Sequence, residues 1–191
     1  MNHDTPTVES GSLSPSSDLH YAAELTAAMQ LLAADPRVVF IGQGVGCGGT
    51  FMSRSFDGIP AEKRIEMPVA EEMQMGMAIG LGLAGFVPVT VYPRFNFLLL
   101  AMNALVNHLD KLPKYRPKVI IRVGVGSTQP LDPGPQHTGD FTDAMRMLCR
   151  RVEFIRLKHA WTIRSAYQMA LERDDGRPTA LVEYPEWYDS K

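Results

Sequence analysis

The sequence has 191 residues, of which 45% are hydrophobic and 21% are charged, and its formal net charge is -2 at pH 7. This length and composition suit one compact domain with an apolar core. The weak negative charge and the lack of any basic run argue against a nucleic-acid-binding protein. Two isolated cysteines, Cys47 and Cys149, suit a reducing compartment and neither a disulfide framework nor a metal cluster. We therefore expect a cytoplasmic protein that supplies no metal site of its own.

The first 18 residues are polar, rich in serine, threonine and proline, and without periodicity, which predicts a disordered tail. Asp18 is a suitable N-cap for a helix over residues 19–33, where apolar residues recur at helical spacing. No basic segment followed by an apolar stretch precedes this helix, so we expect no signal peptide. Residues 19–191 are expected to form a single domain.

From residue 38 onward, short β-rich segments alternate with helical ones. The expected strands are residues 38–42, 64–67, 87–92, 118–123, 152–157 and 179–184. The expected helices between them lie within residues 68–85, 96–112, 141–150 and 159–173. Continuous apolar strands that alternate with helices predict a mostly parallel sheet of about six strands, covered on both faces. The predicted fold class is therefore α/β, a three-layer αβα sandwich.

Residues 73–91 are the one candidate for a membrane span, and Gly76 and Gly80 have the spacing of closely packed membrane helices. Gln74 and the turn at Gly85 interrupt this run, and a strand follows it. The remaining apolar stretch is too short to cross a bilayer as a helix. We therefore expect a soluble protein.

A glycine-rich loop, GQGVGCGG at residues 42–49, follows the first expected strand and invites comparison with a dinucleotide-binding fingerprint. That fingerprint needs G-x-G-x-x-G, with the last glycine opening a helix that receives a pyrophosphate. Here the residues that follow the loop, TFMSRSFDGIP, do not form a convincing helix, and no Lys-Ser/Thr pair of a phosphate loop is present. The loop is more typical of a backbone that turns sharply or lies close to another segment.

Two adjacent carboxylates, Glu71 and Glu72, stand at the start of the helical segment. Acidic residues are common in a first turn because the helix dipole stabilises them, and that role alone could account for both. However, an aromatic cluster, YPRFNF at residues 92–97, follows the next strand and lies at its carboxyl end, where α/β sheets bind ligands. A carboxylate beside such a cluster favours a binding or catalytic site.

Three motifs occur in order within residues 38–184: VVFIGQGVG, MPVAEEMQMGMAIGLGLAGFVPVTVYPRFNF and PQHTGDF. Together they resemble the pyrimidine-binding domain of thiamine diphosphate enzymes. The chain is similar to the β subunit of 2-oxo acid dehydrogenases and, more distantly, to the middle domain of transketolase. The shared pattern is a strand with G-E-x-V, then P-I-S/A-E, a Gly/Ala-rich helix ending in AGxxPV, and an aromatic F-x-F/Y element.

The resemblance implies a role for particular residues. Glu71 would accept a hydrogen bond from the aminopyrimidine ring of the cofactor and so promote proton transfer from its thiazolium carbon. Phe97 would stack on the pyrimidine, with Phe95 as a second candidate for the wall. His137, in the position of the family's Q-H-S histidine, would act as an acid or donate to the substrate carboxylate. Gln43 is expected at the cofactor, where β subunits carry a glutamate that links the cofactor sites.

The resemblance also implies a partner chain. The family holds the diphosphate and magnesium on a second domain with a G-D-G…N motif, and in this sequence Gly139-Asp140 is followed by Phe141. A diphosphate-binding, α-like subunit is therefore expected to supply the magnesium end of the site, most simply in an α2β2 assembly. Small residues on one face of the helical segment, Gly76 and Gly80, suit close contact with such a partner.

The expected function is that of a β-like subunit of a thiamine diphosphate-dependent enzyme. It would cleave or form a carbon–carbon bond next to a carbonyl, with a 2-oxo acid as substrate. One alternative is a transketolase-type half subunit that acts on ketoses or ketose phosphates. An alternative of another class is a non-catalytic, Rossmann-like nucleotide-binding or assembly subunit, which would need neither Glu71 nor the aromatic wall.

Overall fold

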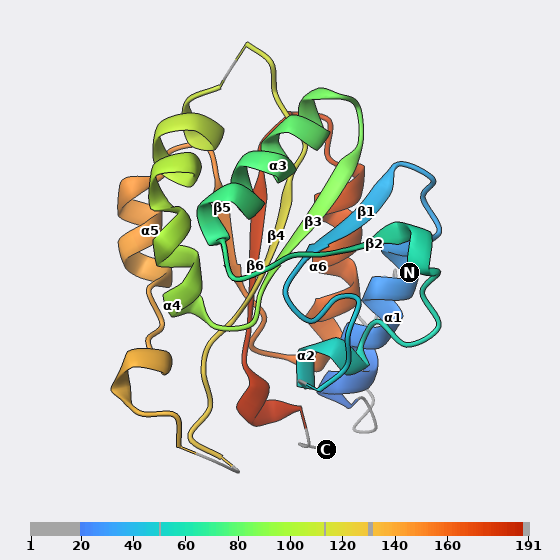
Figure 1. Cartoon of the computed structure of the whole chain (residues 1–191), viewed down its shortest axis with the longest axis vertical. Coiled ribbons are helices and arrows are strands. Elements are labelled where there is room, and N and C mark those ends of the chain that lie inside the picture. The colour runs from blue at the N-terminus through green and yellow to red at the C-terminus, as the bar shows by residue number, and fades with distance from the viewer. Residues whose placement is uncertain (1–19, 50, 113, 130–131, 189–191) are drawn as a thin grey trace, which may run out of the picture.

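The computed structural model describes residues 20–49, 51–112, 114–129 and 132–188. Both the expected N-terminal tail and the expected cap Asp18 lie outside these residues. The centre of the molecule is one six-stranded sheet with the strand order β2-β1-β3-β4-β6-β5 (Figure 1). The strands are β1 (Val38–Gly42), β2 (Arg64–Glu66), β3 (Val87–Tyr92), β4 (Ile120–Gly124), β5 (Glu153–Arg156) and β6 (Thr179–Glu183). Every neighbouring pair is parallel, so the predicted α/β fold is confirmed.

Helices cover both faces of the sheet. Helices α1 (Tyr21–Ala33) and α6 (Ala160–Glu172) lie on one face, and α3 (Glu71–Leu83), α4 (Phe95–Leu98) and α5 (Thr142–Leu148) lie on the other (Figure 1). Successive strand residues point to opposite faces, so neighbours such as Ile120 and Ile121 belong to different apolar clusters. The three layers follow from this alternation.

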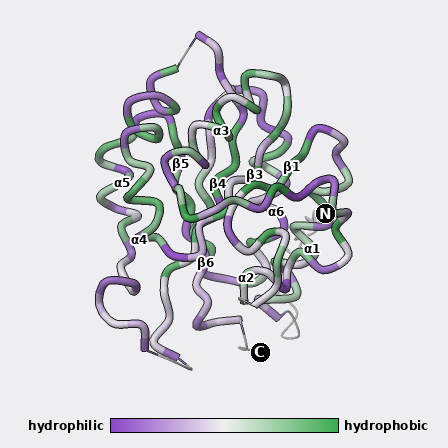
Figure 2. Tube along the Cα trace, viewed as in Figure 1, coloured by the Kyte–Doolittle hydropathy of each residue, from purple (hydrophilic) through white to green (hydrophobic). Residues whose placement is uncertain are grey.

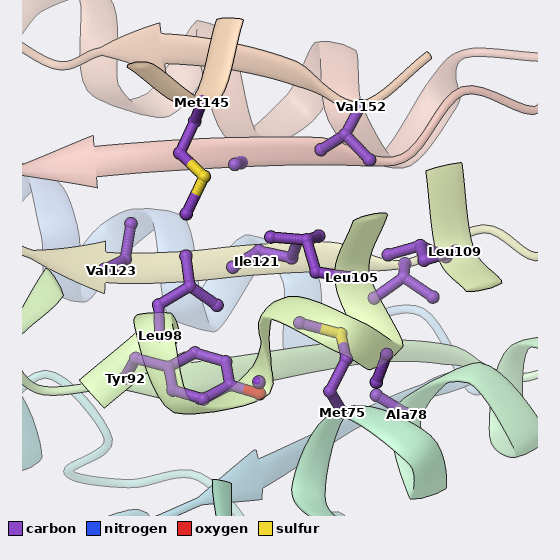
Figure 3. Packing of buried hydrophobic residues seen from close by; sticks show 14 of the residues in the cluster. Met75, Ala78, Tyr92, Leu98, Leu105, Leu109, Ile121, Val123, Met145 and Val152 are labelled. Carbon is purple, nitrogen blue, oxygen red and sulfur yellow. The ribbon is translucent and has the colours of Figure 1, made fainter. Parts of the chain in front are cut away.

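Each face of the sheet has its own apolar core. Met75 and Ala78 of α3, Leu98 of α4 and Met145 of α5 pack together on the same face as Tyr92 (Figure 3). In Figure 2, hydrophobic residues run along the central strands, whereas hydrophilic residues gather in the turns at the rim. Among the described residues, no helix combines the length and the apolar character that a bilayer span requires.

Residues 96–112 are helical, as expected, but they do not form one regular α-helix. The segment begins as α4, tightens into a 3₁₀ turn at Leu99–Ala101, widens into a π-helix at Asn103–His108 and ends in a second 3₁₀ turn at Leu109–Lys111. Tight and wide turns have opposite effects on the rotation per residue, so they offset each other along the segment. Leu98, Leu105 and Leu109 consequently all remain buried.

A short helix also forms where none was expected. Helix α2 (Phe51–Arg54) is a single turn that follows the glycine-rich loop. Met52 lies in the core on the α1 face and anchors the turn there, so a tertiary contact accounts for this helix. The other expected elements differ from the observed ones by only a few residues at their ends, which is the usual uncertainty of element boundaries.

The α1 face contains a buried ion pair between neighbouring strands. Nε of Arg122 in β4 lies 3.0 Å from Oε2 of Glu183 in β6, and both side chains are fully buried. Arg122 also donates to Oγ of Ser55 at 2.6 Å, and Tyr188 donates to the Glu183 carboxylate. Because a buried charge is tolerated only when it is paired and hydrogen-bonded, this arginine has its full set of partners within the chain.

Two glycines of α3 should respond oppositely to alanine. A β-carbon at Gly80 would meet nothing within 4 Å, so Gly80→Ala should raise the free energy of unfolding by about 0.5–1 kcal/mol through helix propensity. A β-carbon at Gly82 would lie 2.9 Å from Cβ of Pro117, so Gly82→Ala should lower it by about 1–3 kcal/mol through overpacking. Urea unfolding of the isolated chain measures both, and equal stabilisation by the two changes would contradict the packing of α3 on Pro117.

Candidate functional site

The candidate site lies at the carboxyl edge of the sheet, where the strand order reverses. The chain leaves β1 outward to β2 and then returns to β3 on the other side of β1. Gly42, at the end of β1, pairs with Val91 near the end of β3. A crevice at such a reversal is where open α/β sheets bind ligands. All the site residues predicted from the sequence lie near this edge. They belong to the segments that follow β1, β3 and β4 and to the first turn of α3.

Glu71 is buried at the first position of α3, with 4% of its surface exposed. Its Oε1 accepts a hydrogen bond of 3.1 Å from Nε2 of Gln43, which directly follows β1. The hydroxyl of Tyr92 donates to the backbone oxygen of Glu71 at 3.3 Å. Within the described part of the chain, Oε2 of Glu71 has no hydrogen-bond donor. One oxygen of the carboxylate is thus held by Gln43, and the other is available to a ligand.

Glu72 differs from Glu71 in its exposure and in its hydrogen-bond partner. It is exposed, and its Oε1 accepts a hydrogen bond of 3.1 Å from Nδ2 of Asn103 on the surface. An exposed pair of this kind contributes little to stability. The structure therefore separates the two adjacent carboxylates into a buried one and a solvated one.

Gln74 lies one turn below Glu71 and was interpreted from the sequence only as a break in an apolar run. It is fully buried, and its Nε2 donates to Oγ1 of Thr90 and to the backbone oxygen of Val91, both at 2.9 Å. These bonds attach the first turns of α3 to β3. The signal available in the sequence was its position, three residues after Glu71 on the buried face of the helix.

Tyr92 completes this support from β3. Burial raises the pKa of its phenol well above the usual value, and a side-chain hydrogen bond with Thr90 opposes that rise only in part. Tyr92 is therefore a hydrogen-bond donor throughout the neutral range and keeps its bond to the start of α3. The side chains that hold the first turn of α3 in place, those of Gln74, Thr90 and Tyr92, are therefore all uncharged.

Phe97 and His137 come together although 40 residues separate them in the sequence. Their ring centroids are 5.7 Å apart, at an interplanar angle of 68°. Nδ1 of His137 is buried and has no hydrogen-bond partner in the part of the chain that the structure describes. A β-carbon at Gly126 would lie 1.7 Å from the backbone oxygen of His137, so only glycine lets the loop after β4 hold this histidine in place.

Phe95 does not form part of an accessible wall. Its side chain is fully buried, with its ring 5.7 Å from that of Phe141 in an edge-on contact and 6.4 Å from that of Phe154 in a stacked one. A ring covered in this way offers no free face to a ligand. The expectation for Phe95 is corrected to a core role, whereas Phe97 remains partly exposed.

The glycine-rich loop is closed by a carboxylate of the protein itself. Oε1 of Glu66 accepts the N–H of Gly44 at 2.7 Å, and Oε2 accepts those of Gly46 at 2.6 Å and Cys47 at 3.3 Å. Partial burial alone would raise the pKa of Glu66, but the backbone donors outweigh it and hold this pKa below its usual range. The N–H groups that a nucleotide phosphate would use are therefore already occupied.

The first residue of the loop, Gly42, must be a glycine for a different reason. Gly42 has φ 153°, and a β-carbon there would lie 2.5 Å from the backbone oxygen of Val91 and 3.1 Å from Nε2 of Gln74. The sequence predicted a backbone that lies close to another segment, and β1 indeed ends against β3. This close approach brings Gln43 within reach of Glu71.

The outer face of α3 is apolar and exposed. The large hydrophobic side chains exposed on and beside it are Val69, Met73, Met77, Leu83 and Phe86. Gly76 and Gly80 lie on the same face, and a β-carbon at either would meet nothing within 4 Å. An uncovered apolar face of this extent is typical of an interaction surface.

The remaining histidines lie away from these groups. His20 and His159 are the N-cap residues of α1 and α6, and the ring of His159 stacks on Trp161 at 4.2 Å. His108 is exposed at the end of the π-helix, and His3 lies outside the described residues. In the described ranges, no three histidine, cysteine or acidic side chains come together as metal ligands would.

The family model for the transketolase pyrimidine-binding domain matches residues 20–187 of the chain. The chain is 37% identical over 83 residues to the 3-methyl-2-oxobutanoate dehydrogenase subunit beta of Mycobacterium tuberculosis, a match that covers 42% of this chain and 24% of that protein. It is 36% identical over 81 residues to the pyruvate dehydrogenase E1 component subunit beta of Staurastrum punctulatum, covering 41% and 25%. These matches thus span about a quarter of the relatives' length.

Solved structures share the fold at low identity. Transketolase from Campylobacter jejuni superposes with a TM-score of 0.69 at 16% identity, covering 87% of this chain and 26% of that one. A split-gene transketolase, described as an inactive beta4 tetramer, superposes with a TM-score of 0.63 at 18% identity, covering 86% and 49%. At these identities, the similarity establishes the architecture.

Proposed function

The chain belongs to the transketolase pyrimidine-binding domain family, and from this premise we propose that it is the β-like subunit of a heteromeric thiamine diphosphate-dependent enzyme. Residues 19–191 form its pyrimidine-binding domain. The observation that carries the proposal is the buried carboxylate of Glu71, fixed through one oxygen by Gln43 and free at the other. It lies at the reversal point of the sheet, where a ligand ring can reach it.

The residues present fit the aminopyrimidine end of the cofactor. A free carboxylate oxygen on Glu71 can accept a hydrogen bond from a protonated ring nitrogen, and Phe97 offers a partly exposed aromatic face. Gln43 orients Glu71 through its amide and would also lie beside the pyrimidine ring when the cofactor is bound. The proposed cofactor-binding residues are therefore Gln43, Phe97 and Glu71, whereas the covered ring of Phe95 belongs to the core.

Thiamine diphosphate, when bound, supplies a carbon nucleophile that attacks the carbonyl of the substrate. The task of the chain is to prepare that carbon through the pyrimidine. Glu71 would hold a proton at the ring nitrogen, in a position fixed by Gln43 on one side and by the Gln74–Thr90 hydrogen bond below. His137, with a buried and unpaired Nδ1 beside Phe97, is placed to donate to the substrate carboxylate or to exchange a proton with the reacting carbonyl oxygen.

A partner chain is needed for the diphosphate and the magnesium ion. What supports a partner is the exposed apolar face of α3, where Gly76 and Gly80 permit close approach of another backbone. We propose an α-like, diphosphate-binding partner with a G-D-G…N motif, assembled as α2β2 and located in the cytoplasm.

The substrate proposed is a 2-oxo acid, from which the enzyme transfers an acyl or aldehyde group. The named β subunits among the relatives favour this reading over a transketolase-type reaction on ketoses, since they share the higher sequence identity. A nucleotide-binding role is disfavoured by the occupied N–H groups of the glycine loop.

Co-expression with a candidate diphosphate-binding chain that carries the G-D-G…N motif tests this proposal directly. We expect a stable complex that co-purifies, contains about one thiamine diphosphate per pair of chains and decarboxylates at least one 2-oxo acid. A complex that forms but takes up no thiamine diphosphate would overturn the proposal.

The isolated chain should bind thiamine diphosphate weakly or not at all, even with magnesium present. Its share of the site holds only the pyrimidine end, and the phosphates carry most of the charge through which the cofactor is bound. Isothermal titration calorimetry measures this, with the reconstituted complex as the positive control. Tight binding to a monomer would refute the idea of a site split between two chains.

A further inference from the structure

Arg94 is an exception among the partly buried arginines that the structure describes. The others, Arg64, Arg151, Arg156, Arg173 and Arg177, each donate to a carboxylate or to a backbone oxygen. The fully buried Arg122 is paired with Glu183. For the guanidinium of Arg94, by contrast, the described residues provide neither a hydrogen-bond acceptor nor an ion pair.

Arg94 lies close to the residues of the proposed site. It lies two residues after the end of β3 and is the N-cap residue of α4, whose third residue is Phe97. A β-carbon at Gly126 would lie 3.2 Å from Nη1 of Arg94 and 1.7 Å from the backbone oxygen of His137. The guanidinium therefore lies beside the loop that carries His137, on the substrate side of the proposed site.

A second polar group of the same segment lacks a partner. Oδ1 of Asn96, two residues after Arg94, is buried and accepts no hydrogen bond from the described part of the chain. Buried polar groups are normally satisfied, and a partly desolvated guanidinium gains most from an anion. The Asn96 oxygen only accepts, so its partner would be a donor such as a hydroxyl group of a ligand. The guanidinium of Arg94 is the group that requires an anion.

The chemistry of the reaction restricts which anion this can be. A carboxylate that leaves as carbon dioxide loses its charge in the transition state. A full ion pair with a guanidinium, unlike a single hydrogen bond from His137, would therefore stabilise the ground state strongly and slow the step. A charge that persists through the reaction can be held at no such cost. Arg94 is therefore suited to an anionic group remote from the reacting carbonyl.

We propose that Arg94 is a specificity-determining residue that binds a second, non-reacting anionic group of the donor substrate. The group is the distal carboxylate of a 2-oxo dicarboxylic acid or the phosphate of a ketose phosphate. This inference rests on the proposed function and deepens it by naming the substrate class.

The kinetic test compares charged and uncharged donors of equal length in the reconstituted complex. The pairs are 2-oxoglutarate against 2-oxopentanoate, and fructose 6-phosphate against fructose. Wild type should prefer the charged member of one pair, and that pair identifies the source of the anion. Arg94→Gln should raise the KM for that member about 10- to 100-fold, as for a lost hydrogen bond to a charged group, with little change in kcat. Arg94→Lys should recover part of the preference.

Arg150→Gln is the matched control. Arg150 is exposed, has no described side-chain partner and precedes β5 at the opposite edge of the sheet. This variant should keep the wild-type preference. An Arg94→Gln enzyme with unchanged preference would overturn the proposal, as would one that loses activity equally on both members of a pair. Dissociation of the Arg94→Gln complex would overturn it too and would assign the guanidinium to a carboxylate of the partner chain.

A binding measurement separates this inference from the proposed function. Glutarate and pentanoate, or inorganic phosphate and chloride, are titrated calorimetrically into the complex without cofactor. Binding of glutarate or phosphate that is weakened at least tenfold by Arg94→Gln supports the anion site even if no turnover is found. If wild type turns over one of the 2-oxo acids but Arg94→Gln changes neither affinity nor preference, the proposed function stands and the inference fails.

Discussion

Glu71→Gln in the reconstituted complex should lower turnover by about two to four orders of magnitude, the range expected when proton-transfer catalysis is lost. The amide keeps the size of the side chain, and its oxygen can still accept the hydrogen bond from Gln43. Its nitrogen then faces the ligand ring as a donor where an acceptor is required. Cofactor content should therefore fall much less than turnover. Steady-state kinetics and cofactor content, measured on the same preparation, distinguish the two effects.

Glu72→Gln is the natural control, because it makes the same chemical change one residue away. Glu72 is exposed and bonded only to the surface residue Asn103 among the described residues, so its replacement should be nearly silent. If Glu72→Gln proved to be the sensitive variant, the assignment of the catalytic carboxylate would be wrong by one residue. Equal loss of cofactor and turnover in Glu71→Gln would assign Glu71 to binding rather than to proton transfer.

The parallel sheet could be predicted because its determinants are local. Runs such as those of β3 and β6 are buried at every position, which is the mark of a strand covered on both faces. The position of Glu71 could be predicted for a similar reason, since it comes a few residues after a strand and a proline and opens a helix. These features depend on residues close together in the chain.

The partners of Glu71 could not be predicted, because they depend on how distant segments meet. The bond from Gln43 spans 28 residues and exists because Gly42 lets β1 approach β3 closely. The hydrogen bonds from the glycine-rich loop to the Glu66 carboxylate join residues about 20 positions apart. No periodicity or motif specifies such contacts. They follow only from the register of the strands, which the sequence pattern leaves open.

The two phenylalanines of the aromatic cluster illustrate the same limit. Phe95 and Phe97 are chemically identical and two residues apart, so a strand-like reading would place them on one side. The chain instead turns into α4 at Phe95, where two residues correspond to roughly 200° of rotation. One ring therefore enters the core against Phe141, and the other turns toward His137.

Gly80→Leu should prevent assembly with the partner chain while leaving the fold of this chain intact. In the isolated chain, the added side chain projects into open space, because nothing lies within 4 Å of a β-carbon at this position. Leucine is also a better helix former than glycine, so the monomer should not lose stability. In the complex, the same side chain would stand between two backbones that small residues allow to approach closely.

The expected result is a chain with unchanged α/β circular dichroism that elutes from size exclusion as a smaller species than the wild-type complex. Activity should disappear with assembly, since the site needs both chains. Ala144→Leu serves as the control, because Ala144 is exposed on α5, away from the apolar face of α3, and its complex should form normally. A Gly80→Leu complex of normal size and cofactor content would show that this face is not the interface. The exposed Met73, Met77 and Leu83 would then require a different partner.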